Sequence, residues 1–246
     1  MRRILAEDVS PFFAFKYGIK GRTYTYIMYF SQACQDKFVL SILKGKRNGH
    51  FLEIGSHHPI HTNNTYTLEK NFDWRGIMIE RDDAFIHLYK EYRPNSAHVI
   101  QDATTIDYKS LLETNNMPAE IDYLQIDLEA NERSTLTALE MFDNTVFDTY
   151  KFATITFEHD VYLGNHFDTR EASRRIFDKR GYVRIFPDVC DHNTAIVFED
   201  WYVHPDLVDM DYVRKLMDDN AAKYVVNSIT GKSINCQDII YNGNGS

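Results

Sequence analysis

The chain has 246 residues, 43% of them hydrophobic and 14% aromatic, which is enough to bury one sizeable α/β core. The formal net charge is -9, and an acidic surface repels phosphate backbones, so nucleic acid is excluded as an expected partner. The acids Glu7 and Asp8 interrupt the start that a signal peptide would need, and no apolar run approaches membrane-spanning length. We therefore expect a cytoplasmic protein with no membrane partner.

Residues 1–30 contain many aromatic residues without a clean period, and we expect this lead-in segment either to pack on the domain or to cover its cleft. Polar residues from Ser31 to Asp36 can cap a helix that we expect to carry the apolar residues up to Leu43. The three cysteines, Cys34, Cys190 and Cys236, lack the spacing of metal ligands, and we expect reduced thiols.

The stretch from Phe51 to Asp82 predicts a strand, a polar turn, a short helix and a second strand. The second strand ends at Glu80, where nucleotide-binding sheets hold ribose hydroxyls. The turn has one glycine, Gly55, and continues with residues 57–59 (HHP) instead of the G-x-G-x-x-G that suits a diphosphate. A cofactor with adenosine and no phosphate, S-adenosylmethionine, fits this turn better. The alternative is an ordinary βαβ unit without a ligand.

The rest of the chain alternates predicted helices and strands before it changes to a hairpin. We expect helices over 83–92, around Leu111, over 132–142 and over 170–180. Strands are expected over 98–100, 121–126 and 152–157. Residues 182–186 and 195–198 are expected to pair as a hairpin. Residues 199–202 are expected to leave the sheet, 209–217 to form a last helix, and 242–246 to be disordered.

Five segments together resemble FkbM-type methyltransferases: SQACQDKF (31–38), FLEIGSHHP (51–59), NNTYTLEKNFDWRGIMIE (63–80), IDYLQIDLEANE (121–132) and TFEHD (156–160). The resemblance implies an α/β, Rossmann-like class I methyltransferase fold, with a seven-stranded, mostly parallel sheet and an antiparallel edge hairpin. It also implies S-adenosylmethionine-dependent O-methylation of a hydroxyl on a sugar, a glycan or a similar small molecule. The domain would span 31–205, and the helix and tail at 206–246 would pack on it.

The resemblance assigns cofactor-binding residues by position. It places Glu53, Gly55 and Ser56 under the methionine moiety of the cofactor, and it places Glu80 at the ribose. Asp102 and Ala103 follow the third strand and would contact the adenine edge, with the carboxylate accepting from the exocyclic amine. Strand-end placement supports this independently, because ligands of doubly wound sheets bind outside the carboxyl ends of the strands. For Asp102, a role as N-cap of the next turn is the alternative.

Charged residues crowd the ends of the next two strands: Asp127, Glu129, Glu158, His159 and Asp160. So many acids at one rim are costly unless a positive group lies among them, either the sulfonium of the cofactor or a divalent metal. Macrolide-sugar O-methyltransferases, which are similar in layout, hold Mg²⁺ with acids at these strand ends. By that resemblance Asp127, Glu158 and His159 would bind Mg²⁺ or Mn²⁺, with Glu129 supporting them or acting as a base. A rim of hydrogen-bonded acids with water and no metal is the alternative.

Methyl transfer to a hydroxyl also needs a group that removes the proton. His159 is the best candidate by its ordinary pKa, and Asp127 is the best by position. Two other functions compete: a catalytically silent, methyltransferase-like binding or scaffold protein, and a nicotinamide oxidoreductase, which lacks its glycine pattern here. The sequence indicates neither the acceptor nor the oligomeric state, and a homodimer stays open.

Overall fold

The computed structural model describes residues 14–19, 22–164, 167–190 and 196–217. Its centre is a seven-stranded sheet with the order β5-β4-β3-β6-β7-β9-β8. These strands are β3 (His50–Ile54), β4 (Arg75–Glu80), β5 (Ala97–Ile100), β6 (Glu120–Ile126), β7 (Lys151–Glu158), β8 (Val183–Cys190) and β9 (Val197–Val203). The first five are parallel, and β9 runs antiparallel between β7 and β8. The order confirms the predicted Rossmann-like class I methyltransferase fold with an antiparallel edge hairpin.

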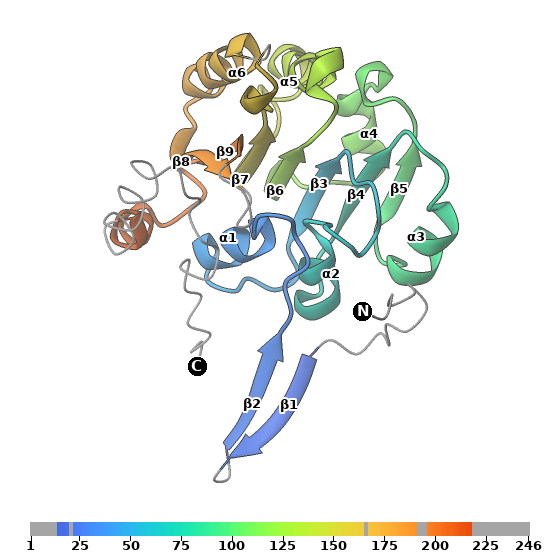
Figure 1. Ribbon diagram of the computed structural model, residues 1–246, viewed down its shortest axis with the longest axis vertical. Helices are drawn as coiled ribbons and strands as arrows, with labels where there is room; N and C mark the ends of the chain where they lie inside the picture. Colours follow the sequence, from blue (N-terminus) through green and yellow to red (C-terminus); the bar gives the residue numbers. More distant parts are fainter. Residues whose placement is uncertain (1–13, 20–21, 165–166, 191–195, 218–246) are drawn as a thin grey trace.

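Helices cover both faces of this sheet (Figure 1). They are α1 (Gln35–Ile42), α2 (Tyr66–Phe72), α3 (Ile86–Tyr92), α4 (Tyr108–Thr114), α5 (Ser134–Thr145) and α6 (Phe167–Lys179), with short 3₁₀ turns η1 (Ala103–Thr105), η2 (Ala130–Glu132) and η3 (Val161–Leu163). Successive residues of β3 point to opposite layers, as side chains of a strand must. Phe51 joins the apolar cluster of Phe38 and Leu68, whereas Leu52 joins that of Leu112 and Phe142.

Residues 199–202 stay in the sheet, which corrects the expectation that they leave it. β9 pairs with β7 from Thr154↔Val203 to Glu158↔Glu199. Its acids have partners inside the protein: Gln35 donates to Glu199 at 2.9 Å, and Arg174 donates to Asp200 at 2.7 Å. Because buried carboxylates with partners are tolerated in a strand, two consecutive acids do not end it.

The N-terminal residues form β1 (Ala14–Ile19) and β2 (Arg22–Ile27), an antiparallel pair separate from the main sheet. Figure 1 shows this pair on the side of the molecule opposite the end toward which β3 and β4 point. β1 and β2 therefore do not cover the carboxyl ends of those strands. Residues 210–217 are helical, close to the predicted last helix, and the predicted disorder at 242–246 lies outside the described residues.

Two other expectations concern the cysteines and the membrane. Cys34 forms a disulfide bond, so the expectation of reduced thiols is wrong for this residue, and Cys190 carries a buried thiol. In the described part of the chain, no helix combines the length and the apolar character that crossing a membrane requires.

Candidate functional site

A cleft of ≈ 410 Å³ opens at the carboxyl ends of the parallel strands. It lies where the strand order reverses around β3 and β6, which is where doubly wound sheets bind ligands. All the residues predicted to bind the cofactor line it: Glu53, Gly55, Ser56, Glu80, Asp102 and Ala103. The acids after β6 and at the end of β7 also line it: Asp127, Glu129, Glu158 and Asp160. The structure thus brings ten of the predicted positions together.

Gly55 forms the floor of the cleft because the backbone passes too close for a side chain. Its φ is +84°, and a Cβ there would lie 1.6 Å from the carbonyl oxygen of Asp127. The amides of Gly55 and Ser56 both donate to the carbonyl of Ile79, at 2.9 and 3.0 Å. The ends of β3, β4 and β6 are therefore joined by backbone contacts at this point.

A buried arginine fixes the loop between β3 and α2. The Arg93 side chain is fully buried and donates to Glu69 at 2.9 Å, to Asn63 Oδ1 at 2.8 Å and to Thr65 Oγ1 at 2.7 Å. It also donates to the carbonyl oxygen of Pro59 at 3.1 Å. Because these partners span residues 59 to 69, one guanidinium holds the whole loop against the domain.

Glu53 lines the cleft but is committed to that same loop. Its carboxylate accepts from Thr65 Oγ1 at 2.7 Å, from the Asn64 amide at 3.1 Å and from Asn63 Nδ2 at 3.2 Å. Burial raises the pKa of Glu53 above its ordinary value, while Arg93 and these hydrogen bonds act in the opposite direction. A contact of Glu53 with the methionine moiety stays a prediction.

The segment 57–59, which departs from the family pattern, builds this loop. His57 has a φ of 44°, and its amide donates to Glu80 Oε2 at 2.8 Å. His58 Nδ1 accepts from the amides of Ile60 and His61, at 3.1 and 3.0 Å. Burial and the neighbouring histidines lower the pKa of His58 to about 4. His58 is thus a neutral hydrogen-bond acceptor for the loop.

Glu80 ends β4 and connects two loops. One oxygen accepts from the His57 amide, and the other accepts from the amides of Arg81 and Asp82 at 2.7 and 2.9 Å. A carboxylate oxygen has more than one acceptor position, so these bonds fix the orientation of Glu80 and leave capacity for hydroxyl donors in the cleft.

Asp102 caps the 3₁₀ turn η1, as the alternative interpretation held. Its Oδ1 accepts from the amide and the hydroxyl of Thr104, at 2.9 and 2.7 Å, and these bonds lower its pKa. In the described residues, Oδ2 has no hydrogen-bond partner. Asp102 therefore caps the turn through Oδ1, while Oδ2 stays available beside Ala103 for a ligand. The role as N-cap and the predicted contact with adenine are thus compatible.

Asp127 follows β6 beside a glutamine that the sequence analysis missed. Gln125 Nε2 donates to Asp127 Oδ2 at 3.0 Å. Burial, the charge of Asp160 and, more weakly, those of Glu53 and Glu129 raise the pKa of Asp127 to about 7. Gln125 is 3% exposed, and its Oε1 is buried without a hydrogen-bond partner in the described chain. The two-residue period of the strand could have indicated Gln125, because positions 125 and 127 share a face.

His159 does not join Asp127 and Glu158 in the cleft, contrary to the prediction. It is fully buried, and its Nε2 faces Asp200 Oδ1 at 3.6 Å and Asp188 Oδ1 at 3.9 Å. Its Nδ1 accepts from the Val161 amide at 3.3 Å, which assigns the ring proton to Nε2. The chain turns directly after His159, at Asp160, whose φ is 47°, and His159 is not among the residues that line the cleft. The structure therefore gives His159 no contact with an acceptor.

The described residues do not form the predicted metal site. The group of three potential ligands that converges within 4.8 Å in this part of the chain is His159, Asp188 and Asp200, outside the cleft. Arg174 donates to Asp188 at 2.8 Å and to Asp200 at 2.7 Å, so this group is already an ion-pair network. Because Asp127, Glu158 and His159 do not converge, the donor set does not fit Mg²⁺ or Mn²⁺.

Neither a protein-family model nor a curated protein matches the chain. Similar solved structures include a TehB-like SAM-dependent methyltransferase from Corynebacterium glutamicum (10% identity, TM-score 0.46, 72% of this chain and 89% of that one). SMU.1697c from Streptococcus mutans, solved with SAH, is 9% identical (TM-score 0.47, 72% and 99%). The N-terminal domain of EvdMO1, solved in the presence of SAH and D-fucose, is 12% identical (TM-score 0.45, 78% and 90%). At these values the likeness establishes no shared activity.

Proposed function

We propose that the chain is an S-adenosylmethionine-dependent O-methyltransferase of the FkbM type, which methylates a hydroxyl of a sugar, a glycan or a similar small molecule. The observation that carries the proposal is the placement of Glu80 and Asp102 at the ends of neighbouring strands, both on the cleft where the strand order reverses. A strand-end acid at such a point can accept from both ribose hydroxyls. A cytoplasmic location, and a small-molecule partner rather than nucleic acid or membrane, remain predictions.

The residues of the cleft fit this cofactor. Asp102 Oδ2 is an acceptor without a partner in the described residues, and it suits the exocyclic amine of adenine. The lining contains several carboxylates, and its basic side chains are those of Arg81 and His57. A negative environment of this kind favours a sulfonium over an uncharged thioether. Glu80 would accept hydrogen bonds from the ribose hydroxyls.

Asp127 is the group that we assign to the proton of the acceptor. Bound S-adenosylmethionine would supply a methyl group whose bond to sulfur breaks, with its electron pair left on sulfur, as the bond to the acceptor oxygen forms. Asp127 would receive the hydroxyl proton on Oδ1, because Gln125 already donates to Oδ2. A carboxyl with a pKa of about 7 is a stronger base than an ordinary carboxylate and is still ionised just above neutral pH. We assign no step to His159 or to Mg²⁺ or Mn²⁺, because these ligands do not converge.

The proposal is tested with methyl-labelled S-adenosylmethionine and a panel of hydroxylated acceptors. We expect wild-type protein to transfer the label, Asp127→Asn to lose about 10²-fold or more of the rate while it still binds the cofactor, and the exposed control Asp211→Asn to match wild type. Binding of NAD without binding of S-adenosylmethionine would contradict the proposal in favour of an oxidoreductase. Cofactor binding with no transfer to any acceptor would favour the silent binding module.

A further inference from the structure

The carboxylates that line the cleft differ in what they contact. Most of them have partners in the described residues: Glu53 accepts from the 63–65 loop, Glu80 from three backbone amides, Asp102 from Thr104, Asp127 from Gln125, and Glu132 pairs with Arg81 at 3.5 Å. These five carboxylates therefore already have hydrogen-bond or ion-pair partners within the protein.

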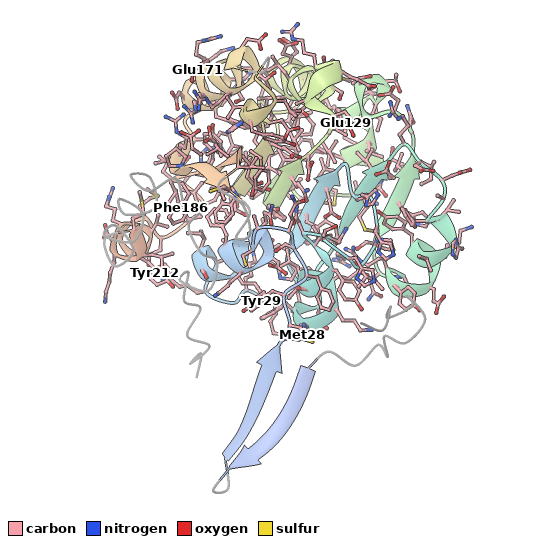
Figure 2. All side chains as sticks on the ribbon, in the orientation of Figure 1. Met28, Tyr29, Glu129, Glu171, Phe186 and Tyr212 are labelled. Atoms are coloured by element: carbon pink, nitrogen blue, oxygen red, sulfur yellow. The ribbon has the colours of Figure 1, made fainter. Side chains whose placement is uncertain are left out.

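Glu129 and Glu158 are different. Neither carboxylate makes a hydrogen bond or an ion pair with any residue that the structure describes. Glu129 follows β6 and Glu158 ends β7, and these two strands are paired up to Ile126 and Phe157. Figure 2 shows Glu129 near the end of the sheet toward which β3 points. Two uncommitted carboxylates thus lie on the rim of one cleft, after neighbouring strands.

An aromatic ring shares that rim. Tyr162 in η3 lines the cleft and is 50% exposed. Tyr162 lies two residues after Asp160 and lines the same cleft as Glu129 and Asp127. Burial first, and then the charges of these three acids, raise the pKa of its phenol. An aromatic face beside carboxylates is a binding environment for an ammonium group.

A second observation, independent of the acids, indicates a ligand in the same cleft. Gln125 is 3% exposed and lines the cleft, and its Oε1 has no partner among the described residues. A buried amide oxygen without a partner costs free energy unless a donor reaches it. The cleft is therefore built for a ligand that brings N–H or O–H donors.

We infer that the acceptor carries a positively charged amino group next to the hydroxyl that is methylated, as in an amino sugar, and that Glu129, Glu158 and Tyr162 hold this ammonium while the hydroxyl faces Asp127. The inference rests on the proposed function and names the class of its acceptor. The ammonium keeps its protons and is not methylated. The new bond forms at the hydroxyl oxygen, whose proton goes to Asp127.

The charges of Glu129 and Glu158 distinguish a cationic acceptor from a neutral or an anionic one. S-adenosylmethionine has one sulfonium, one ammonium and one carboxylate, so it brings a single net positive charge. A neutral sugar would displace water from Glu129 and Glu158 without compensating their charge, and an acceptor with a phosphate or a carboxylate would be repelled. An ammonium has three N–H donors, so it can bind both acids, offset part of their charge and gain from the Tyr162 ring.

Matched pairs of sugars test the inference directly. D-glucosamine, D-galactosamine and D-mannosamine are compared with their N-acetyl forms and with the parent hexoses, by calorimetry in the presence of S-adenosylhomocysteine and by label transfer from S-adenosylmethionine. We expect binding and transfer to favour an amine by at least about tenfold over its neutral counterparts, with the methyl group on oxygen by mass spectrometry. Equal or better use of a neutral form, no binding of any amine, or a methyl group on nitrogen would overturn it.

Variants of Glu129 and Glu158 with side chains of the same shape test whether these residues bind the ammonium of the acceptor. Glu129→Gln and Glu158→Gln keep shape and remove charge, so each should reduce the preference for the amine by about tenfold, through KM rather than kcat. Glu113→Gln, an exposed position on α4 away from the cleft, is the matched control. A preference unchanged in both cleft variants contradicts the inference. Failure of the wild-type protein to bind S-adenosylmethionine would instead remove the proposed function itself.

Discussion

The carbonyl oxygen of Asp127 lies 1.6 Å from the point that a Cβ on Gly55 would occupy. This contact joins the end of β3 to the residue after β6, which is also the residue assigned to the proton of the acceptor. The amide of Asp127 donates to the carbonyl of Ile54 at 3.0 Å, so backbone hydrogen bonding holds the same junction. The residue that we propose as the proton acceptor is thus positioned by the absence of a side chain on the neighbouring strand.

Gly55→Ala is therefore expected to be more harmful than the same change at Gly181. Gly181 provides a matched control, because its φ of +81° is nearly the same and a Cβ there would meet nothing within 4 Å. Gly181→Ala should lower the free energy of unfolding by about 1–2 kcal/mol through backbone strain alone. Gly55→Ala should cost about 1–3 kcal/mol more, because the junction must also open. Chemical denaturation measures both, and equal costs would show that the close approach to Asp127 does not matter.

Arg93 should stabilise the loop between β3 and α2 as a unit. Arg93→Gln leaves Glu69 buried without a cationic partner, so we expect a loss of about 3–5 kcal/mol in the free energy of unfolding. Arg93→Lys keeps the charge but cannot reach Glu69, Asn63 and Thr65 together, so its loss should be smaller, and its affinity for S-adenosylmethionine should still fall. Arg175→Gln, an exposed change on α6, is the control. An Arg93→Gln protein as stable as this control would refute the assignment.

The buried acids predict how stability depends on pH. The pKa of Asp127 is raised to about 7 and that of Glu199 to about 8, in each case chiefly by burial, from ordinary values of 3.8 and 4.5. Between about pH 4 and pH 8 these groups bind more protons in the folded protein than in the unfolded chain, so their contribution to the free energy of unfolding falls as pH rises. Asp127→Asn should flatten this fall by about 2–4 kcal/mol across the window. Denaturation of both proteins at pH 5 to 8.5 tests this; parallel pH dependences would contradict it.

The N-terminal pair of strands should be dispensable for the cofactor site. β1 and β2 form their own sheet, whereas the hydrogen bonds that join the segment to the domain begin at the Met28 carbonyl and the Phe30 amide, which contact Thr67 and Asp36. Deletion of residues 1–27 should therefore leave S-adenosylmethionine affinity within about twofold of the full chain. Calorimetry on both proteins checks this, and a large loss of affinity would place the segment at the cleft.

Sequence patterns predicted the sheet and most of the cleft because both follow from short-range rules. Apolar runs mark the strands, and the acids that follow them must gather at one edge of a parallel sheet, which placed Glu80, Asp102 and Asp127 correctly on the cleft. Residues 199–202 were misjudged because the partners of their acids, Gln35 and Arg174, are 164 and 26 residues away.

Side-chain direction at strand ends was not predictable in the same way. His159 directly follows β7, but its ring lies beside Asp188 of β8 and Asp200 of β9, which local spacing does not connect to it. Arg93 was missed because its partners lie 24 to 34 residues earlier and no local pattern connects them. Such contacts depend on tertiary packing, which spacing alone does not reveal.

The central claim is that the cleft binds S-adenosylmethionine with Glu80 at the ribose. The most direct measurement is calorimetric titration of S-adenosylmethionine into wild-type protein, Glu80→Ala and the exposed control Glu113→Ala. We predict that wild type and the control bind alike, and that Glu80→Ala, still folded, binds more weakly by about 1–3 kcal/mol, because charge-assisted hydrogen bonds are lost. Wild-type protein that does not bind S-adenosylmethionine, or a folded Glu80→Ala protein with unchanged affinity, would contradict the account.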